Sequence, residues 1–463
     1  MVIEKTFPSK RERFIKKFPF TVKKMIKEEI KNYLIDFQKS ELPALVEREL
    51  KIRKIKKIKS IIGPRRAGKT FFMYQEIKRL MGSGIKKENI LYLNFEDPGL
   101  IGVNFKEIGE IIKLHWQLYP ASIKEKLHIF IDEPQNIKNW EIAIRALYDN
   151  GFDVYISGSS SKLLSKEIAT SLRGRSISHI LLPFSFREFL KMKETVFDTA
   201  RLSSKEKANL LALFNEYLEY GGFPEIIPEN KENKIKIIKE YLDLIIYRDI
   251  VERYKIKNVQ LIRWLINSLI ASFSREFSVH KTYLTLKSRG LRLSKNTLYS
   301  YLSMLEDSMF VYSLPKFDYS IRKKEFSINK AYLCDMGFTR IMEISENKGR
   351  KIENIVFLEL VKQKNKNPLI DIFYWKNQQQ EEVDFVVKQG TKPKQLIQVC
   401  SDFSNFETKK REIRALIKAS RELKCKNLVV ITEDYEKEET AEWLGTKRKI
   451  KIIPIWRWLL EDY

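Results

Sequence analysis

The sequence predicts an α/β protein in which a parallel sheet near the N-terminus is followed by a helical region and a second α/β region. Between about residues 58 and 182, short apolar runs alternate with helical patterns; the runs read IKSIIG, ILYLNF, LHIFIDE and DVYISGS. Buried strands that are separated by helices are typical of a parallel sheet. Beyond residue 331, strand and helix patterns mix again. These observations together predict the α/β class.

The regions outside this first sheet complete five predicted segments. Residues 1–57 form an N-terminal segment that is helical from about residue 20 to 50, because its apolar residues recur at three- and four-residue spacing. Residues 183–265 form a helical lid that contains the turn signal GGFP. Residues 266–330 hold two short helical patterns followed by MFVYSLPKFD, which is the order of a winged helix-turn-helix. Residues 331–463 form the second α/β domain.

The composition is that of a globular protein with several domains. The chain has 463 residues, of which 43% are hydrophobic and 12% aromatic, so it can build buried cores. No apolar signal core opens the sequence, and no run approaches the roughly 18 apolar residues that a membrane span needs. Cys334, Cys400 and Cys425 lie far apart and do not follow a metal-ligand or disulfide spacing. We expect a cytoplasmic protein without a membrane partner.

The charge balance is strongly basic. The chain carries 86 Lys and Arg against 60 Asp and Glu, for a formal charge of +26. Such an excess attracts polyanions and makes nucleic acid, DNA or RNA, a candidate partner. A surface rich in Lys and Glu, as in proteins from hot environments, accounts for the same numbers without any binding track. Both interpretations stay open at this point.

A phosphate-binding loop is the most specific motif of the sequence. Its pattern is GxxxxGK[ST], and its residues are Gly63, Pro64, Arg65, Arg66, Ala67, Gly68, Lys69 and Thr70. It follows the apolar strand IKSIIG and opens a helix at FFMYQEI, which is the context that the motif requires. Backbone N–H groups of such a loop surround the phosphates of ATP, Lys69 neutralises them, and the Thr70 hydroxyl is a ligand for Mg²⁺.

An acidic pair ends the strand LHIFI. Charged residues are costly beside a buried strand unless they serve a site at its carboxyl end. We expect Asp132 to hold the Mg²⁺ shell and Glu133 to polarise the attacking water. The alternative is a pair of acids that caps the next helix.

Residues of two further segments are candidates for the same reaction. The strand DVYI runs into the hydroxyls of Ser157, Ser159 and Ser160 where the sheet meets the phosphate side, and one of them, with Ser159 preferred, could position the lytic water. Arg173 and Arg175 lie shortly afterwards in LRGR and could reach the γ-phosphate of a neighbouring subunit. An ordinary surface salt bridge is the alternative for each arginine.

Taken in order, several strings resemble the archaeal and bacterial AAA+ ATPases that carry a nuclease-like C-terminal domain. They are GPRRAGKT, LYLNFEDPGL, IFIDEPQNIKNWE, YISGSSSKLLS, SLRGRSISHILLPFSFREFL, YGGFPE and YRDIVERY. The resemblance implies an AAA+ parallel sheet with a lid and ATP-binding residues at Gly68, Lys69, Thr70, Asp132 and Glu133. It also implies a sensor hydroxyl at Ser159, arginines at Arg173 and Arg175, and a homo-oligomer.

The same resemblance implies a restriction-endonuclease-like domain after the winged helix. Such nucleases need a helix acid, a strand acid, and an acid-x-lysine pair on the next strand to hold Mg²⁺. Glu353 matches the helix acid and Asp384 the strand acid, but Gln398 and Cys400 stand where the second acid and the lysine are needed. Neither type can replace a carboxylate or an ammonium group in that role. The domain is therefore expected to be inactive, unless Lys409 or Lys410 supplies the missing charge.

The helix pattern from Leu293 to Leu305 is the candidate nucleic-acid contact. Lys295, Asn296 and Tyr299 carry hydrogen-bond donors on one side, while its leucines follow core spacing. The same helix could instead contact another domain or a partner.

The preferred interpretation is an ATPase in a homo-oligomer that acts on nucleic acid. A nucleotide-controlled switch that binds a protein partner is the alternative. An ATP-powered, metal-dependent nuclease is the third possibility.

Overall fold

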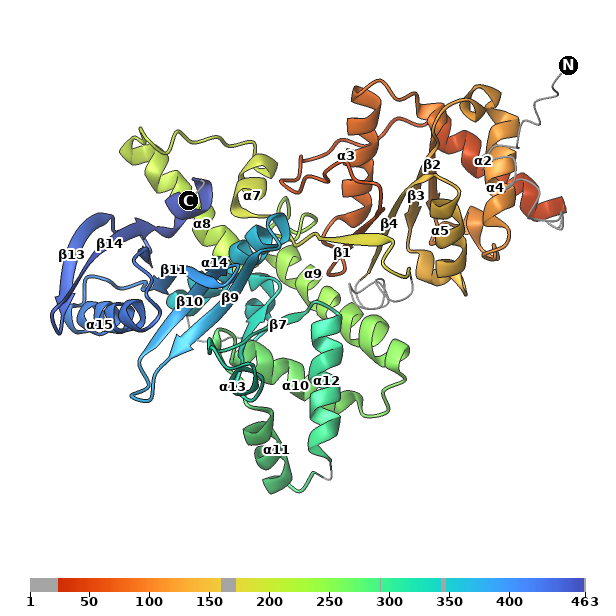
Figure 1. The fold of residues 1–463 in the computed structure, drawn as a ribbon. Helices are drawn as coiled ribbons and strands as arrows, with labels where there is room; N and C mark the ends of the chain where they lie inside the picture. The colour runs from red at the N-terminus through yellow and green to blue at the C-terminus, as the bar shows by residue number, and fades with distance from the viewer. Residues whose placement is uncertain (1–23, 160–171, 292, 343–346, 462–463) are drawn as a thin grey trace, which may run out of the picture. The chain divides into compact units, whose positions relative to one another are not determined.

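The computed structural model describes residues 24–159, 172–291, 293–342 and 347–461 (Figure 1). The chain divides into two compact units, residues 1–181 and 182–463, and each is described by itself. The predicted boundary after residue 182 lies one residue from this division, while the finer boundaries remain predictions. In the described residues, no helix has both the length and the apolar character that crossing a bilayer requires.

The first unit is built on the predicted parallel sheet. Its five strands are β1 (Ile58–Gly63), β2 (Ile90–Asn94), β3 (His128–Asp132), β4 (Asp153–Ser159) and β5 (Ser176–Ile180). They are arranged in the order β2-β3-β4-β1-β5, and every neighbouring pair is parallel. All carboxyl ends therefore lie at one edge, which is where ligands bind in sheets of this kind.

Helices cover this sheet. They are α2 (Lys24–Lys39), α3 (Lys69–Gly82), α4 (Ile108–Leu118) and α5 (Trp140–Asp149), with short 3₁₀ turns at Lys87–Asn89, Pro98–Leu100, Pro120–Ile123 and Pro134–Asn136. The helix α3 buries Phe72, Met73 and Ile77 in one core with Ile61 and Phe130 of the sheet. This packing fixes the helix that begins at the phosphate-binding motif against the strand that precedes it.

The N-terminal helix is shorter than predicted. The pattern predicted helix to about residue 50, but α2 ends at Lys39 and residues 41–57 are not helical. Pro43 explains the difference, since proline has no N–H to donate and restricts the residue before it to extended backbone. The prediction was wrong for this stretch.

The second unit begins with helices, as predicted for residues 183–265. These are α7 (Phe186–Met192), α8 (Ser204–Tyr220), α9 (Lys231–Leu244) and α10 (Val259–Ala271), with a π-helical segment at Ile245–Glu252. Capping boxes begin α7 at Ser185 and α8 at Ser203, where each serine and the glutamate three residues later satisfy each other's backbone N–H. The turn after α8 packs closely, because a Cβ at Gly221 would lie 1.6 Å from a carboxylate oxygen of Asp335.

A small helical and sheet region follows. It contains β6 (Arg275–Glu276), α11 (Val279–Ser288), α12 (Lys295–Asp307), β7 (Val311–Leu314), α13 (Ile321–Glu325) and β8 (Lys330–Leu333). The three strands form an antiparallel sheet in the order β6-β8-β7. The predicted boundary between residues 330 and 331 falls inside β8. That boundary would cut a strand, so it does not divide the chain between two structural regions.

The last region is a mixed sheet with helices. After a 3₁₀ segment at Met336–Ile341 its elements are α14 (Lys348–Lys366), β9 (Ile370–Lys376), β10 (Glu382–Gln389), β11 (Lys392–Val399), α15 (Phe406–Glu422), β12 (Leu428–Thr432), β13 (Lys437–Trp443), β14 (Thr446–Pro454) and α16 (Ile455–Leu460). The strand order is β13-β14-β12-β11-β10-β9. Neighbouring strands are parallel from β11 through β12 to β14 and antiparallel elsewhere. Trp456 and Trp458 of α16 are buried, so the C-terminal aromatic residues pack into this region.

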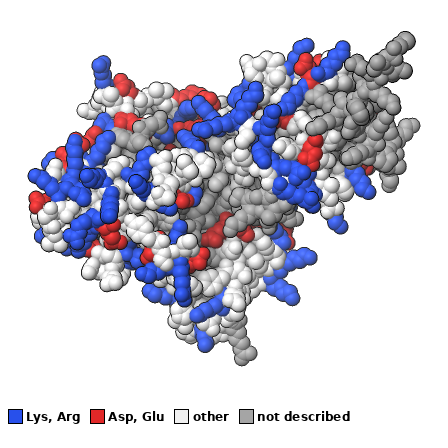
Figure 2. All heavy atoms as spheres, in the orientation of Figure 1, with Lys and Arg blue, Asp and Glu red and all other residues white. Residues whose placement is uncertain are grey.

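Lys and Arg are spread over the surface. In Figure 2 they lie over many elements of the visible face and alternate with Asp and Glu. Many of them pair with acids, as Lys449 does with Glu438 and Lys364 with Asp371. The visible face therefore shows mixed charge.

Candidate functional site

The phosphate-binding motif forms a tight loop between β1 and α3. Gly68 has a φ of 88°, a backbone conformation that glycine adopts without steric cost, and α3 begins at the next residue. Gly63 ends β1, and a Cβ there would lie 2.0 Å from the carbonyl oxygen of Leu181. Both glycines are therefore required by the backbone itself. The loop ends at a helix N-terminus, which is a ready anion-binding position.

Lys69 and Thr70 begin α3 with their side chains in defined contacts. The buried Lys69 ammonium donates to the carbonyl oxygens of Gly63 and Pro64, at 3.1 and 3.0 Å. The Thr70 hydroxyl donates to Asp132 Oδ2 at 2.6 Å. The motif and the acid that ends β3 are 62 residues apart in the chain, and this hydrogen bond joins them in one site.

Asp132 is the buried centre of the site. Its side chain accepts hydrogen bonds from the hydroxyls of Thr70, of Ser157 on β4, and of Tyr92 on β2 at 3.2 Å. The strand register causes this convergence, because Asp132 pairs with Ser157 on one side and with Asn94 on the other. Burial, followed by the charge of Asp132, raises the pKa of Tyr92, so this hydroxyl remains a donor at neutral pH.

Glu133 follows with a strained backbone. Its φ is 51°, in the left-handed region that non-glycine residues seldom adopt, and its N–H donates to the Ser157 carbonyl at 2.9 Å. Gln135 donates to the Glu133 carboxylate. The Glu133 side chain does not cap the 3₁₀ turn that follows, so the capping alternative is not what the structure shows for this residue. Strain of this kind is common at functional sites.

Sequence reasoning missed Tyr92 and Arg48 of this site, and it included Ser157 only as one of the hydroxyls that could position water. Ser157 and Tyr92 lie within apolar strands, and only the register brings their hydroxyls to Asp132. Arg48 lies in the non-helical N-terminal stretch, is buried, and donates to the carbonyl oxygen of Ala67 at 2.8 Å. A buried arginine that supports the loop backbone gave no signal in the sequence, because it belongs to no motif.

The other predicted catalytic residues, Ser159, Arg173 and Arg175, lie in different parts of the first unit. The backbone of Ser159 pairs with Gly63 at the end of β4, but its side chain is outside the described residues. Arg173 is exposed, and Arg175 makes a two-point ion pair with Asp149 at 2.8 and 3.2 Å. Arg175 directly precedes β5, and the first residue of β5 pairs with the first residue of β1. Arg175 therefore lies at the amino ends of these strands, opposite the edge that carries the phosphate-binding loop of the same chain. Six strand residues separate the two edges, or about 20 Å.

In the second unit, the predicted nuclease residues lie together around a lysine that was not predicted. The Lys330 ammonium from β8 is 2.9 Å from Glu353 Oε1, 3.1 Å from Asp384 Oδ1 and 2.6 Å from Glu382 Oε1. Burial disfavours its charge, but the neighbouring carboxylates, Glu353 first, hold the pKa of Lys330 well above its usual value. Burial and the charge of Asp384 raise the pKa of Glu353 to about 8.

Of the remaining members of the predicted nuclease site, Gln398 contacts Asp384: its Oε1 accepts from the Asp384 N–H at 3.3 Å, and its Nε2 donates to Glu412 on α15 at 2.8 Å. Burial raises the pKa of the Cys400 thiol to about 12. Lys409 is bonded to Glu439 at 2.8 Å. The suggestion that Lys409 or Lys410 supplies the missing charge is therefore wrong for Lys409. Lys330 brings the positive charge to the acids instead, and its contacts with three carboxylates occupy the position where a cation is needed.

A match to a family model agrees with the P-loop assignment. Residues 55–190 match a family described as an AAA domain, and residues 211–348 and 348–458 match two domains of unknown function (DUF8612 and DUF4143). A Walker-type ATPase of Pyrococcus abyssi, paby2304, is similar to 73% of this chain over 99% of its own, with 13% identity and a TM-score of 0.40.

Two curated relatives align over long stretches. The uncharacterized protein MJ1544 of Methanocaldococcus jannaschii is 40% identical over 446 residues, or 95% of this chain and 96% of its own. An uncharacterized protein of Haemophilus influenzae is 31% identical over 310 residues, or 66% of this chain and 74% of its own. The chain therefore belongs to the family of MJ1544, and its first unit is a P-loop ATPase domain of the AAA type.

Proposed function

We propose that this protein binds and hydrolyses Mg-ATP, and that the reaction changes the conformation of a homo-oligomer that acts on nucleic acid. The single observation that carries the proposal is the contact between Thr70 and Asp132. It joins the phosphate-binding loop to Asp132 at the end of β3. Glu133, the proposed base, directly follows Asp132 in the chain. A structural loop would not need this pair of oxygen ligands at a helix N-terminus.

The side chains fit the reaction. Thr70 and Asp132 offer the hard oxygen ligands that Mg²⁺ prefers, and they already lie within hydrogen-bonding distance. Bound Mg²⁺ would neutralise charge on the phosphates. Lys69 would turn its ammonium from the loop carbonyls to the β- and γ-phosphates, and Glu133 would accept a proton from the attacking water. Ser159 would orient that water.

ATP turnover by the full chain tests the proposal. Wild-type protein should hydrolyse ATP with Mg²⁺ and lose turnover with EDTA. Lys69→Ala should bind nucleotide poorly, whereas Glu133→Gln should bind and hydrolyse slowly. Absence of both binding and turnover in the wild type would contradict the proposal.

A homo-oligomer gives Arg173 and Arg175 a role that one chain cannot give them. Both lie at the sheet edge away from their own loop, so either could serve only the site of a neighbouring subunit. The Arg175 ion pair with Asp149 would then have to open. Turnover per chain that rises with protein concentration would support such a shared site.

Nucleic acid is the proposed substrate of the second unit. Residues 266–330 have the element order of a winged helix, and α12 exposes Lys295, Asn296 and Tyr299. The chain's +26 charge favours phosphate contact. Stimulation of turnover by duplex DNA, single-stranded DNA or RNA, and loss of it at high salt, would identify the substrate class.

A nucleotide-controlled switch that binds a protein partner is the second candidate. The observation that favours it is the mixed charge of the visible face, where Asp and Glu lie among Lys and Arg (Figure 2). Turnover that no polynucleotide changes would favour the switch.

A nuclease is the least supported candidate. We propose that the last region is restriction-endonuclease-like but inactive, because Lys330 contacts both acids that would have to hold the metal, Glu353 and Asp384. Incubation of DNA and RNA with the protein and Mg²⁺ or Mn²⁺ should give no nicking.

A further inference from the structure

A pocket lined by aromatic rings lies next to Asp132 in the first unit. Its volume is about 480 Å³, within the usual range of small-molecule sites. Tyr33 and Phe37 line it from one face of α2, Tyr74 from α3 and Tyr92 from β2. The Tyr92 ring centroid is 5.4 Å from that of Phe37 and 5.2 Å from that of Tyr74. The partly buried rings of Phe37 and Tyr74 therefore pack against the buried ring of Tyr92.

The pocket is acidic within a strongly basic chain. Glu29, Asp36 and Asp97 line it, and none of the described residues that line it is Lys or Arg. The overall charge of +26 does not cancel this local field, because charges beyond about 8 Å are largely screened at physiological ionic strength. The pocket therefore attracts cations.

The cation that fits is organic rather than metallic. The described residues include no group of three His, Cys, Asp or Glu placed to hold a metal ion, so the lining of the pocket does not offer such a group. Aromatic faces attract ammonium and guanidinium groups. At one end of the pocket, the Lys87 ammonium lies 5.0 Å from the Phe37 ring centroid and donates to the carbonyl oxygen of Ser40. This contact shows how such rings hold a cation here.

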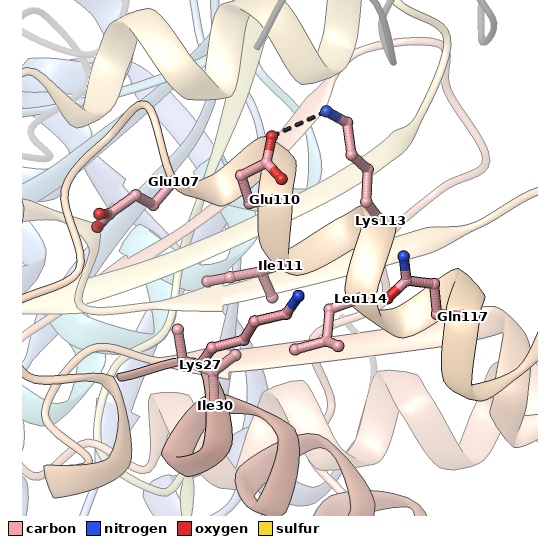
Figure 3. A pocket seen from close by; sticks show the side chains of 8 residues that line it. All are labelled: Lys27, Ile30, Glu107, Glu110, Ile111, Lys113, Leu114 and Gln117. Carbon is pink, nitrogen blue, oxygen red and sulfur yellow. Dashed lines mark hydrogen bonds and ion pairs between the residues drawn. The ribbon is translucent and has the colours of Figure 1, made fainter. Parts of the chain in front are cut away.

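A second hollow of the same unit has a different character. It lies between α2 and α4, holds about 80 Å³, and is lined by Lys27 and Lys113 together with acids (Figure 3). Glu110 and Lys113 form an ion pair there at 2.8 Å. The small volume and the lining lysines make that hollow unsuitable for an organic cation.

We propose that the pocket next to Asp132 binds the ammonium or guanidinium group of an organic cation, and that Tyr92 couples its occupancy to the nucleotide site. The cation is either a small amine or a Lys or Arg side chain, since the two share this chemistry. The coupling, but not the binding, rests on the proposed ATPase function.

The route of the coupling is short. Tyr92 is one of the residues that line the pocket, and it donates its hydroxyl to Asp132 Oδ2 at 3.2 Å. The same oxygen accepts from Thr70 at 2.6 Å. A cation in the pocket that Tyr92 lines makes its hydroxyl a stronger donor to Asp132 Oδ2. The carboxylate is then less available to Mg²⁺, so occupancy lowers the affinity for Mg-ATP.

Binding is tested by titration calorimetry on the full chain without nucleotide. The probes are spermidine, agmatine, and the blocked tripeptides Gly-Lys-Gly and Gly-Arg-Gly. The double variant Glu29→Gln/Asp36→Asn should bind about tenfold more weakly, because two charges that face the ligand are lost. The matched control Glu28→Gln/Glu141→Gln removes two carboxylates that do not line the pocket and should bind like the wild type.

Each outcome decides the binding proposal. Binding of the amines alone identifies a small amine, and binding of the tripeptides alone identifies a protein side chain; binding of both kinds of probe supports the shared chemistry. Absence of binding by every probe, or equal weakening in both double variants, overturns the site.

The coupling has its own test. Tyr92→Phe keeps the ring and removes the hydroxyl, so the cation should still bind but should no longer lower Mg-ATP affinity, measured with a fluorescent ATP analogue. An unchanged effect of the cation in Tyr92→Phe overturns the coupling. Failure of the wild type to bind nucleotide contradicts the proposed function, and the calorimetric result then still decides the pocket.

Discussion

The Thr70 hydroxyl donates a hydrogen bond of 2.6 Å to Asp132 Oδ2, and through it the first residues of α3 contact the end of β3. This contact places two oxygen ligands beside the phosphate-binding loop. Since Tyr92 and Ser157 donate to the same carboxylate, its position is fixed from three elements.

We expect substitutions of Lys69 and of Glu133 to impair different steps, namely ATP binding and ATP hydrolysis. Lys69→Ala removes the charge that faces the phosphates, so ATP affinity should fall. Glu133→Gln keeps the shape and removes the base, so turnover should fall by about 10²–10⁴ while affinity changes little. Binding and turnover assays check this, with Lys78→Ala on the exposed side of α3 as control. Equal loss of affinity in both variants would contradict the assigned roles.

Gly63→Ala should destabilise the first unit severely. The new Cβ would lie 2.0 Å from the Leu181 carbonyl oxygen, and backbone on both sides leaves little room to relax. A loss of more than about 3 kcal/mol is expected in denaturant unfolding. Gly82→Ala is the matched control, since a Cβ there meets nothing within 4 Å. Similar unfolding midpoints for both variants would show that the close approach is absent.

Above about pH 8, where Glu353 is ionised, Lys330→Met should destabilise the second unit by about 3–5 kcal/mol, because it leaves buried carboxylates without their counter-charge. Denaturant unfolding measures the loss. Lys323→Met, at an exposed position of α13, should change stability by less than about 0.5 kcal/mol. Adding Glu353→Gln to Lys330→Met should recover part of the loss. If Lys330→Met is as stable as the wild type, the acids do not depend on this ammonium.

Stability of the second unit should fall as pH rises from about 4.5 to about 8. The Glu353 carboxyl keeps its proton to about pH 8 when folded, while its ordinary pKa is 4.5. The folded state therefore binds more protons in this window, and raising the pH favours unfolding. Asp335, with a pKa raised by burial to about 7, acts in the same direction. Unfolding midpoints should depend less on pH in Glu353→Gln than in the wild type; identical slopes would contradict the assignment.

Variants of the Arg175–Asp149 ion pair distinguish a structural role of Arg175 from a catalytic role. Both side chains are partly exposed, so either Arg175→Ala or Asp149→Ala should cost at most about 1 kcal/mol in thermal unfolding. If Arg175 serves a neighbouring subunit, Arg175→Ala should also lower ATP turnover at least about tenfold, whereas Asp149→Ala should not. Equal turnover in both variants assigns the arginine to the ion pair alone.

The sequence by itself determined the nucleotide-binding core. The apolar strands, the phosphate-binding motif and the acidic pair are local patterns, and a parallel sheet brings the carboxyl ends of its strands to one edge whatever lies between them. Lys69, Thr70, Asp132 and Glu133 could therefore be named from order and spacing. The length of the N-terminal helix could not, because its apolar spacing continued past Pro43.

Only the tertiary structure decided which distant groups meet. Tyr92 and Ser157 reach Asp132 through strand register, which the spacing of a single strand does not contain. Lys330 reaches Glu353 and Asp384 across 23 and 54 residues of chain, and it belongs to no motif that names these partners. A buried charge depends on whatever packing places beside it, so its partner is a property of the fold and not of its neighbours in the sequence.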